Sequence, residues 1–144
     1  MPLLEVGHLD APAFSHDPDA AALDAAFARL SAEERLRRTL GELFADRVAL
    51  VSSFGADSAV VLHMVAAIRP ETPVVFVDTG HLFAETIAYR DRLIERLGLR
   101  DVRTVSPDAD DLAQQDGENF LWSSAPDLCC RVRKVLPQIG RAHV

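Results

Sequence analysis

The sequence predicts an α/β protein built on a parallel sheet, and two observations support this fold class. Short apolar runs rich in β-branched residues occur at residues 47–54 and 72–80, as expected of buried strands, and residues 99–107 predict a third strand. Two stretches with helical spacing, residues 57–68 and 81–98, lie between these runs. Strands that alternate with helices at this spacing form parallel sheets with crossover helices.

The residues before the first strand predict a helical lead-in over residues 1–46. Residues 1–18 are rich in Pro, Asp and His and indicate an irregular start, whereas residues 17–44 are rich in Ala and Leu with helical spacing. We expect a break between two helices near Ser31, because the run Ser-Ala-Glu-Glu starts a helix in the manner of a capping box. The α/β domain then covers residues 47–138.

Local signals predict how the following helices begin and end. Asp57 is expected to cap a helix over residues 58–68. Gly98 is expected to end the next helix as a C-cap. Residues 108–117 predict a short helix or a loop.

Composition and charge narrow the class of protein. The 144 residues fit one domain, and an apolar fraction of 49% is enough for a buried core. The net charge of −7 disfavours a nucleic-acid partner, which would need a basic face. No run has the length of a membrane span and no signal peptide is seen, so we expect no membrane partner and a cytoplasmic location.

The run SSFGADS, residues 52–58, joins the first predicted strand to the helix that follows it. Ligands of open parallel sheets bind at the carboxyl ends of the strands, and a strand–turn–helix unit aims free backbone N–H groups at an anion. Gly55 lets the backbone approach closely, and Ser52, Ser53 and Ser58 add hydroxyl donors. The turn therefore predicts an anion site, with a capped turn without ligand as the alternative. It is neither a Walker A loop nor a GxGxxG motif.

Three motifs follow one another along the chain: SSFGADS, then VFVDTGHLFAETIAYRDRL, then DLCCRVRK. In this order they resemble the assimilatory adenylyl-sulfate and phosphoadenylyl-sulfate reductases. The resemblance implies a Rossmann-like parallel sheet of the adenine-nucleotide alpha-hydrolase (PP-loop) type, incomplete at its C-terminal end. It places the nucleotide site on Ser52, Ser53, Phe54, Gly55, Asp57, Ser58, Asp78, Thr79 and Gly80.

Not every residue of these motifs is expected to bind a ligand. The alternative for Asp78 is a helix cap after its strand. His63 and Met64 carry no metal-ligand spacing and are expected to pack in the core. The role of His81, beside the second turn, stays open.

Cys129 and Cys130 are the only cysteines of the chain, and they lie about one turn into a predicted helix. Ser124 is a favourable N-cap for this helix, with Pro126 in its first turn and Asp127 as the N3 acid. A helix N-terminus and neighbouring cations favour thiolates, the form that binds metals. The alternative is two buried cysteines that pack as small apolar groups.

The resemblance adds a cofactor to this segment. In the iron–sulfur branch of the family, which typically reduces adenylyl sulfate, an adjacent cysteine pair binds a 4Fe-4S cluster together with a C-terminal CxxC motif. Cys129 and Cys130 would supply two of the four ligands. Arg133 and Lys134 would stand near the cluster and the substrate as electrostatic helpers. The nucleophilic cysteine that the family carries near its C-terminus is not among these residues, so we assign no catalytic cysteine here.

Residues 139–144, IGRAHV, do not resemble the family. They are the translation of ATC GGA AGA GCA CAC GTC, the start of a common sequencing adapter whose leading AG would complete a codon for Gln138. We therefore expect authentic sequence to end at Pro137 or Gln138 and the rest to be adapter-derived. The alternative is a genuine short C-terminus.

Three functions compete. The first is thioredoxin-dependent reduction of adenylyl sulfate to sulfite and AMP, with this chain as a fragment that lacks the catalytic C-terminus. The second is the sulfate adenylyltransferase small subunit, which ordinarily carries a lysine where this chain has Ala56 and which lacks the cysteine pair. The third is a non-catalytic adenine-nucleotide binding module. Homo-oligomerisation stays open.

Overall fold

The computed structural model describes residues 20–141, and it divides the chain into two compact units between Ser31 and Ala32. In the first unit, the described residues form helix α1, Ala20–Phe27. The predicted irregular start at residues 1–18 lies outside the described residues. The predicted break near Ser31 is confirmed.

The second unit begins with helix α2, Ala32–Arg38, which runs into a π-helical turn, η1, Thr39–Leu43. Helix α2 packs against helix α3, Ala56–Ile68. These residues therefore belong to the α/β unit, and the unit boundary lies before Ala32 rather than before residue 47. Burial explains why this segment belongs to the α/β unit, because Leu40 is only 3% exposed there.

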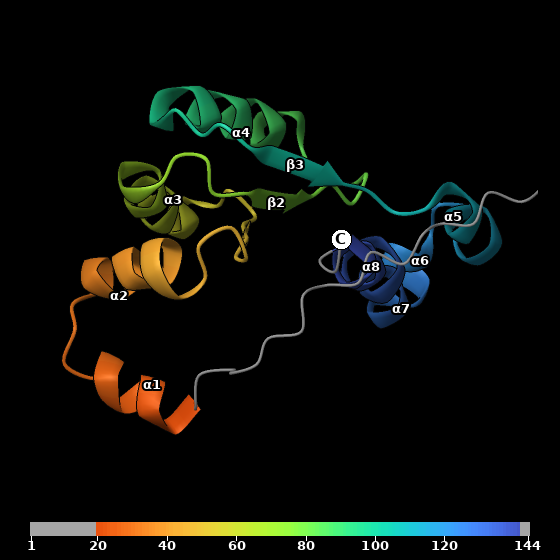
Figure 1. Ribbon diagram of the computed structural model, residues 1–144. Helices are drawn as coiled ribbons and strands as arrows, with labels where there is room; N and C mark the ends of the chain where they lie inside the picture. Colours follow the sequence, from red (N-terminus) through yellow and green to blue (C-terminus); the bar gives the residue numbers. More distant parts are fainter. Residues whose placement is uncertain (1–19, 142–144) are drawn as a thin grey trace, which may run out of the picture. The chain divides into compact units, whose positions relative to one another are not determined.

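The α/β unit contains a parallel sheet, as predicted. Its strands are β1, Leu50–Val51, β2, Val74–Val77, and β3, Val102–Val105, in the order β1-β2-β3. Figure 1 shows β2 and β3 side by side. Val51 pairs with Val75, and Val77 pairs with Val105. All the carboxyl ends therefore meet at one edge of the sheet. The first strand is much shorter than the apolar run that predicted it.

The core lies between the sheet and two crossover helices, α3 and α4, Ala84–Leu97, which contact each other. Strand β2 alternates between buried and half-buried residues, so that Val74 and Phe76 face Leu62 of α3 and Leu93 of α4. Full burial of such side chains contributes about 1.5–3 kcal/mol each. Within the described residues, no helix is long and apolar enough to cross a membrane.

The ends of the two crossover helices test two predictions. Helix α3 begins at Ala56 with Gly55 as its N-cap and without a side-chain cap, so the prediction that Asp57 caps this helix was wrong. Gly55 has an extended backbone, so the helix begins directly after it, at Ala56. Asp57 therefore lies inside the first turn of the helix and not at its N-cap. Gly98 ends α4 in the left-handed conformation with φ 67°, as predicted.

Five short helical segments follow β3 and lie beyond the arrowheads of β2 and β3 in Figure 1. They are α5, Ala109–Gln115; α6, Leu121–Ser124; α7, Pro126–Cys130; a π-helical turn, η2, Arg131–Val135; and α8, Leu136–Arg141. Asp108 caps α5 by accepting from two backbone N–H groups. The prediction that Ser124 caps the cysteine helix was wrong. Ser124 ends α6 and donates its hydroxyl to the Phe120 carbonyl, so Ala125 is the N-cap of α7.

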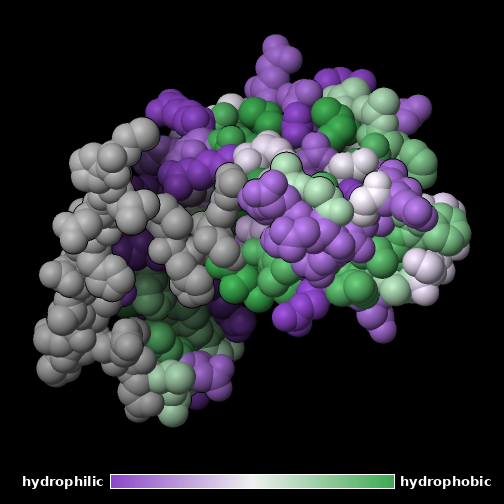
Figure 2. Space-filling model, turned by 90° about the vertical axis from the view of Figure 1, so that its right-hand side faces the viewer, coloured by the Kyte–Doolittle hydropathy of each residue, from purple (hydrophilic) through white to green (hydrophobic). Residues whose placement is uncertain are grey.

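Hydrophobic side chains also reach the surface. Figure 2 shows them interspersed with hydrophilic ones on the face turned to the viewer. Val60, Phe83 and Trp122 are each more than half exposed. Among them, Trp122 belongs to the segment that carries the cysteines and therefore to the site described next.

Candidate functional site

The turn after β1 is anchored to the core at its start. The N–H of Ser52 donates to the Val75 carbonyl at 3.0 Å, which extends the β1–β2 ladder by one bond. The Ser52 hydroxyl accepts from the Phe54 N–H at 3.1 Å. Phe54 has a positive φ of 55° and a ring that is 1% exposed. Because this exposed fraction covers the whole residue, neither the ring nor the backbone of Phe54 offers accessible surface for a nucleotide.

The remaining predicted residues of this turn are accessible. Ser53, Gly55 and Asp57 are exposed, and Ser58 is half-buried in the first turn of α3. Helix α3, which is 13 residues long, begins in this turn, and the N–H groups of its first turn have no acceptor within the helix. Helix N-termini of this kind attract anions, and the anion site at this turn stays a prediction.

The turn after β2 is folded by its own side chains. The Asp78 carboxylate accepts from the Gly80 N–H at 2.9 Å, and the Thr79 hydroxyl accepts from the His81 N–H at 3.3 Å. Gly80 has φ 76°, which suits glycine. Because Asp78 bonds within the turn and α4 begins only at Ala84, the helix-cap alternative for Asp78 was wrong.

The second turn is tied to the cysteine helix by Arg133. Its Nη1 donates to the Thr79 carbonyl at 3.0 Å. Its Nε and Nη2 donate to one oxygen of Asp116 at 2.9 and 2.6 Å, and Nη2 also donates to the Asn119 side-chain oxygen at 2.7 Å. The Asp116 and Arg133 side chains are 1% and 7% exposed. Arg133 therefore serves as a buried clamp whose charge is balanced, whereas the sequence suggested a helper near the substrate.

Asp116 is held from both sides. Its second carboxylate oxygen accepts from the Phe120 and Leu121 N–H groups at 2.8 and 2.9 Å. These backbone bonds, that from Leu121 foremost, and the bond from Arg133 lower the pKa of Asp116 below its ordinary value. The carboxylate is therefore charged under ordinary conditions, which suits its pairing with a guanidinium.

A cavity of about 420 Å³ joins the second turn to the cysteines. Cys129 is buried and Cys130 is exposed. Lys134 is exposed, and within the described residues it has no ion-pair partner. The described lining residues are Thr79, His81, Trp122, Cys129, Cys130, Arg133 and Lys134. The structure therefore brings the second turn and the cysteines together, and the Ser52–Ser58 turn does not contribute to this lining.

The cysteine pair fits a metal cluster only in part. In residues 20–141, no three His, Cys, Asp or Glu side chains are grouped so that they could hold a metal ion. The two thiols stand at adjacent positions of one helix, and one of them is accessible. These residues could thus supply two cluster ligands, and a complete four-ligand site requires donors from elsewhere.

Asp116, Asn119 and Trp122 were not singled out in the sequence. The Asp116-Gly117 pair is a common turn signal, and Asn119 takes a positive φ of 55°, as Asn does more readily than most residues. Trp122 is the only tryptophan. Its ring meets that of Phe120 edge to face at 5.9 Å. These signals indicated a structured loop, but none indicated that it would reach Arg133.

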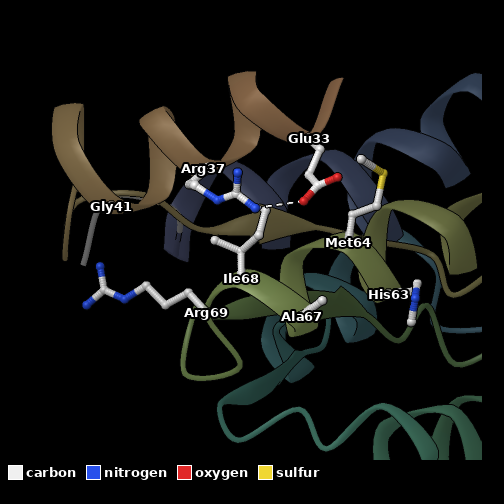
Figure 3. A pocket seen from close by; sticks show the side chains of 8 residues that line it. All are labelled: Glu33, Arg37, Gly41, His63, Met64, Ala67, Ile68 and Arg69. Carbon is white, nitrogen blue, oxygen red and sulfur yellow. Dashed lines mark hydrogen bonds and ion pairs between the residues drawn. The ribbon is translucent and has the colours of Figure 1, made fainter. Parts of the chain in front are cut away.

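A second cavity, of about 700 Å³, lies between α2 with η1 and α3 (Figure 3). An ion pair between Glu33 and Arg37, 2.7 Å long, lies along it. His63 is exposed and Met64 half-buried here, so the prediction that both pack in the core was wrong for His63. The cause is helix geometry, since the core face of α3 is formed by Leu62 and Val65.

The structure is an α/β fold built on a parallel sheet, with the turns after β1 and β2 at the carboxyl edge of that sheet. The structure of phosphoadenylyl-sulfate reductase from Candida auris, solved as a phosphate complex, is similar with a TM-score of 0.70 and 24% identity. The match covers 85% of this chain and 60% of that one, and it supports the fold alone.

Residues 47–141 match the family described as the phosphoadenosine phosphosulfate reductase domain, and the chain belongs to this family. It is 48% identical over 118 residues to an adenosine 5'-phosphosulfate reductase of Mesorhizobium japonicum, covering 82% of this chain and 46% of that protein. It is 47% identical over 121 residues to the enzyme of that name from a Chelativorans species, covering 83% and 49%. The chain thus spans about half the length of these relatives.

Proposed function

We propose that the protein to which this chain belongs reduces adenylyl sulfate to sulfite and AMP with electrons from thioredoxin. The observation that carries the proposal is the cavity in which the cysteine pair and the exposed cation of Lys134 face the turn after β2. The relatives named above are reductases of sulfated adenine nucleotides, and this favours reduction over the other two functions.

In this reaction, the chain would bind the nucleotide and stabilise the negative charge of its sulfate group. The backbone N–H groups of the turn after β1 and the hydroxyls of Ser53 and Ser58 would hold the nucleotide phosphate. The exposed ammonium of Lys134 would face the sulfate end and stabilise its negative charge. Arg133 is already balanced by Asp116, so among the described Lys and Arg residues that line the cavity Lys134 remains for the substrate.

The chemical step needs a thiolate that we expect from the part of the protein beyond this chain. The thiolate attacks the sulfur of adenylyl sulfate, the bond from sulfur to the phosphate oxygen breaks, and AMP leaves with the electron pair. Thioredoxin then attacks the resulting enzyme thiosulfonate, sulfite is released, and the thioredoxin dithiol ends as a disulfide. We further propose that Cys129 and Cys130 are two of the four ligands of a 4Fe-4S cluster.

The test is a comparison of kcat/KM for adenylyl sulfate and for its 3′-phosphorylated form, on the full-length gene product with thioredoxin as reductant. We expect the unphosphorylated substrate to be preferred. Replacement of Lys134 by Met should lower kcat/KM by roughly tenfold or more, because a charge-assisted contact is lost. The matched control is Arg131→Met, which removes an exposed cation that does not line the cavity. A preference for the 3′-phosphorylated substrate, or equal losses in both variants, would refute the proposal.

A further inference from the structure

We infer that Asp116 is a positioning residue: through Arg133 it holds the cysteine helix against the turn after β2 and thereby keeps Cys129 buried and Cys130 exposed. Its importance for catalysis rests on the proposed function. The positioning itself can be tested without substrate, cluster or activity.

The Arg133 guanidinium donates to two segments of the chain. Three of its bonds go to Asp116 and Asn119, in the loop between α5 and α6, and the fourth goes to the Thr79 carbonyl. A guanidinium presents five donors in a rigid planar fork, so contacts on one side fix the direction of the other. The loop therefore determines where Nη1 meets the turn.

Arg133 is also connected to the cysteines along the backbone, three and four residues after them. It lies in η2, which continues directly from α7, and the segment α7 is in contact with η2. A shift of Arg133 would thus be transmitted to Cys129, which is only 9% exposed. Cys130, the next residue, is exposed already and has little protection to lose.

The turn side of the clamp leaves little room for movement. A Cβ on Gly80 would lie 3.3 Å from Nη1 of Arg133, closer than ordinary van der Waals contact. Loss of one partner from a buried ion pair leaves an uncompensated charge, which must then move toward water. Without the Asp116 charge, Arg133 is therefore expected to leave the Thr79 carbonyl and to carry the cysteine helix with it.

The experiment measures the alkylation rates of Cys129 and Cys130 separately, by iodoacetamide labelling and fragment-ion mass spectrometry. The reduced 144-residue chain is used with a chelator and without nucleotide. In the wild type we expect Cys130 to react about tenfold faster than Cys129 or more, because a buried thiol reacts only through local opening. In D116N the ratio should fall to within about threefold of unity, because Cys129 becomes accessible.

Three variants separate positioning from general stability. D101N removes an exposed carboxylate that pairs with Arg103 and should leave the rate ratio unchanged. L62A destabilises a core cluster that contains none of the clamp residues, and it should lower the melting temperature without changing the ratio under native conditions. N119G removes one acceptor and tolerates the positive φ of Asn119, so it should give an intermediate ratio and serves if D116N does not fold.

A wild-type ratio in both D116N and N119G would overturn the inference, as would an equal fall in L62A. If the ratio changes in D116N but the full-length wild-type protein has no reductase activity, the proposed function is refuted and the positioning role stands.

Discussion

The ring of Phe54 meets the ring of Phe76 edge to face, with centroids 5.6 Å apart and planes at 80°. The Arg90 guanidinium lies over the ring of Phe76 at 4.9 Å. A residue in the turn after β1 is thus fixed to the centre of strand β2. This contact explains why a non-glycine residue is held at positive φ in this turn: the buried ring offsets the backbone strain.

Replacement of Phe54 by Ala is therefore expected to be strongly destabilising. Loss of the ring from a closed core should lower the free energy of unfolding by about 3–5 kcal/mol. Urea denaturation followed by circular dichroism measures this loss. The control is Phe83→Ala, which removes a ring that is 78% exposed. That change should stay within about 0.5 kcal/mol of the wild type. Equal losses in the two variants would contradict the role assigned to Phe54.

Two glycines with similar backbone angles should respond differently to alanine. Gly80 and Gly98 have φ 76° and 67°, so each substitution is expected to cost about 1–2 kcal/mol of backbone strain. At Gly98 the new methyl group meets open space, whereas at Gly80 it approaches Arg133. Gly80→Ala should therefore also displace the clamp and expose Cys129 to alkylation. Thiol labelling that is the same in both variants would show that the close approach has no consequence.

Asp116 is expected to make stability depend on acid pH. Its pKa is lowered in the folded state by the Leu121 N–H, Arg133 and the Phe120 N–H. Its contribution is therefore complete above the ordinary value of 3.8 and is lost as the pH falls through the lowered folded pKa. The stability difference between wild type and D116N should thus shrink as the solution becomes more acidic than this value.

Thermal unfolding at a series of pH values from about 6 to about 2 checks the expected acid dependence. D101N is the matched control, because the Arg103 hydrogen bond also lowers the pKa of Asp101, although this pair is exposed. Exposed pairs are weakened by solvent, so the difference between D101N and wild type should be smaller at every pH. A difference for D116N that grows on acidification would have the wrong sign for this account.

The 144-residue chain is not expected to assemble a 4Fe-4S cluster by itself. Cys129 and Cys130 are its only thiols, and a cluster is ordinarily held by four thiolates. Anaerobic reconstitution with iron and sulfide should leave little visible absorbance and little bound iron after desalting. A full complement of cluster iron per chain would show that other residues, or a second chain, complete the site.

The sequence predicted the parallel sheet, the two turns at its carboxyl edge and the left-handed end of α4. Each follows from local patterns: β-branched runs, a serine-rich turn and a glycine after an amphipathic helix. The buried ring of Phe54 was not predicted, because its place in the SSFGADS motif indicated a ligand surface and the pattern does not show into which side of the turn a ring points.

The balanced charge of Arg133 could not be read from the sequence either. Its partners, Asp116 and Asn119, lie 17 and 14 residues away, in a loop whose course depends on the packing of several short helices. Local reasoning therefore grouped Arg133 with its neighbour Lys134. Burial separates the two: one is enclosed and paired, and the other faces solvent.

The π-helical turn at Arg131–Val135 makes this segment sensitive to a change in length. Its wider winding sets the angle between the cysteines before it and the residues after it. Deletion of one residue would rotate one side against the other by about 100°, since an α-helix has 3.6 residues per turn. Arg131 is exposed, so Arg131→Ala should leave the far-ultraviolet circular dichroism spectrum unchanged. Deletion of the same residue should abolish the spectrum of the folded protein. Equal spectra of the two variants would show that the length of this segment is not critical. In evolutionary terms, Arg131 is open to substitution, whereas the length of the whole stretch is closed to insertion or deletion.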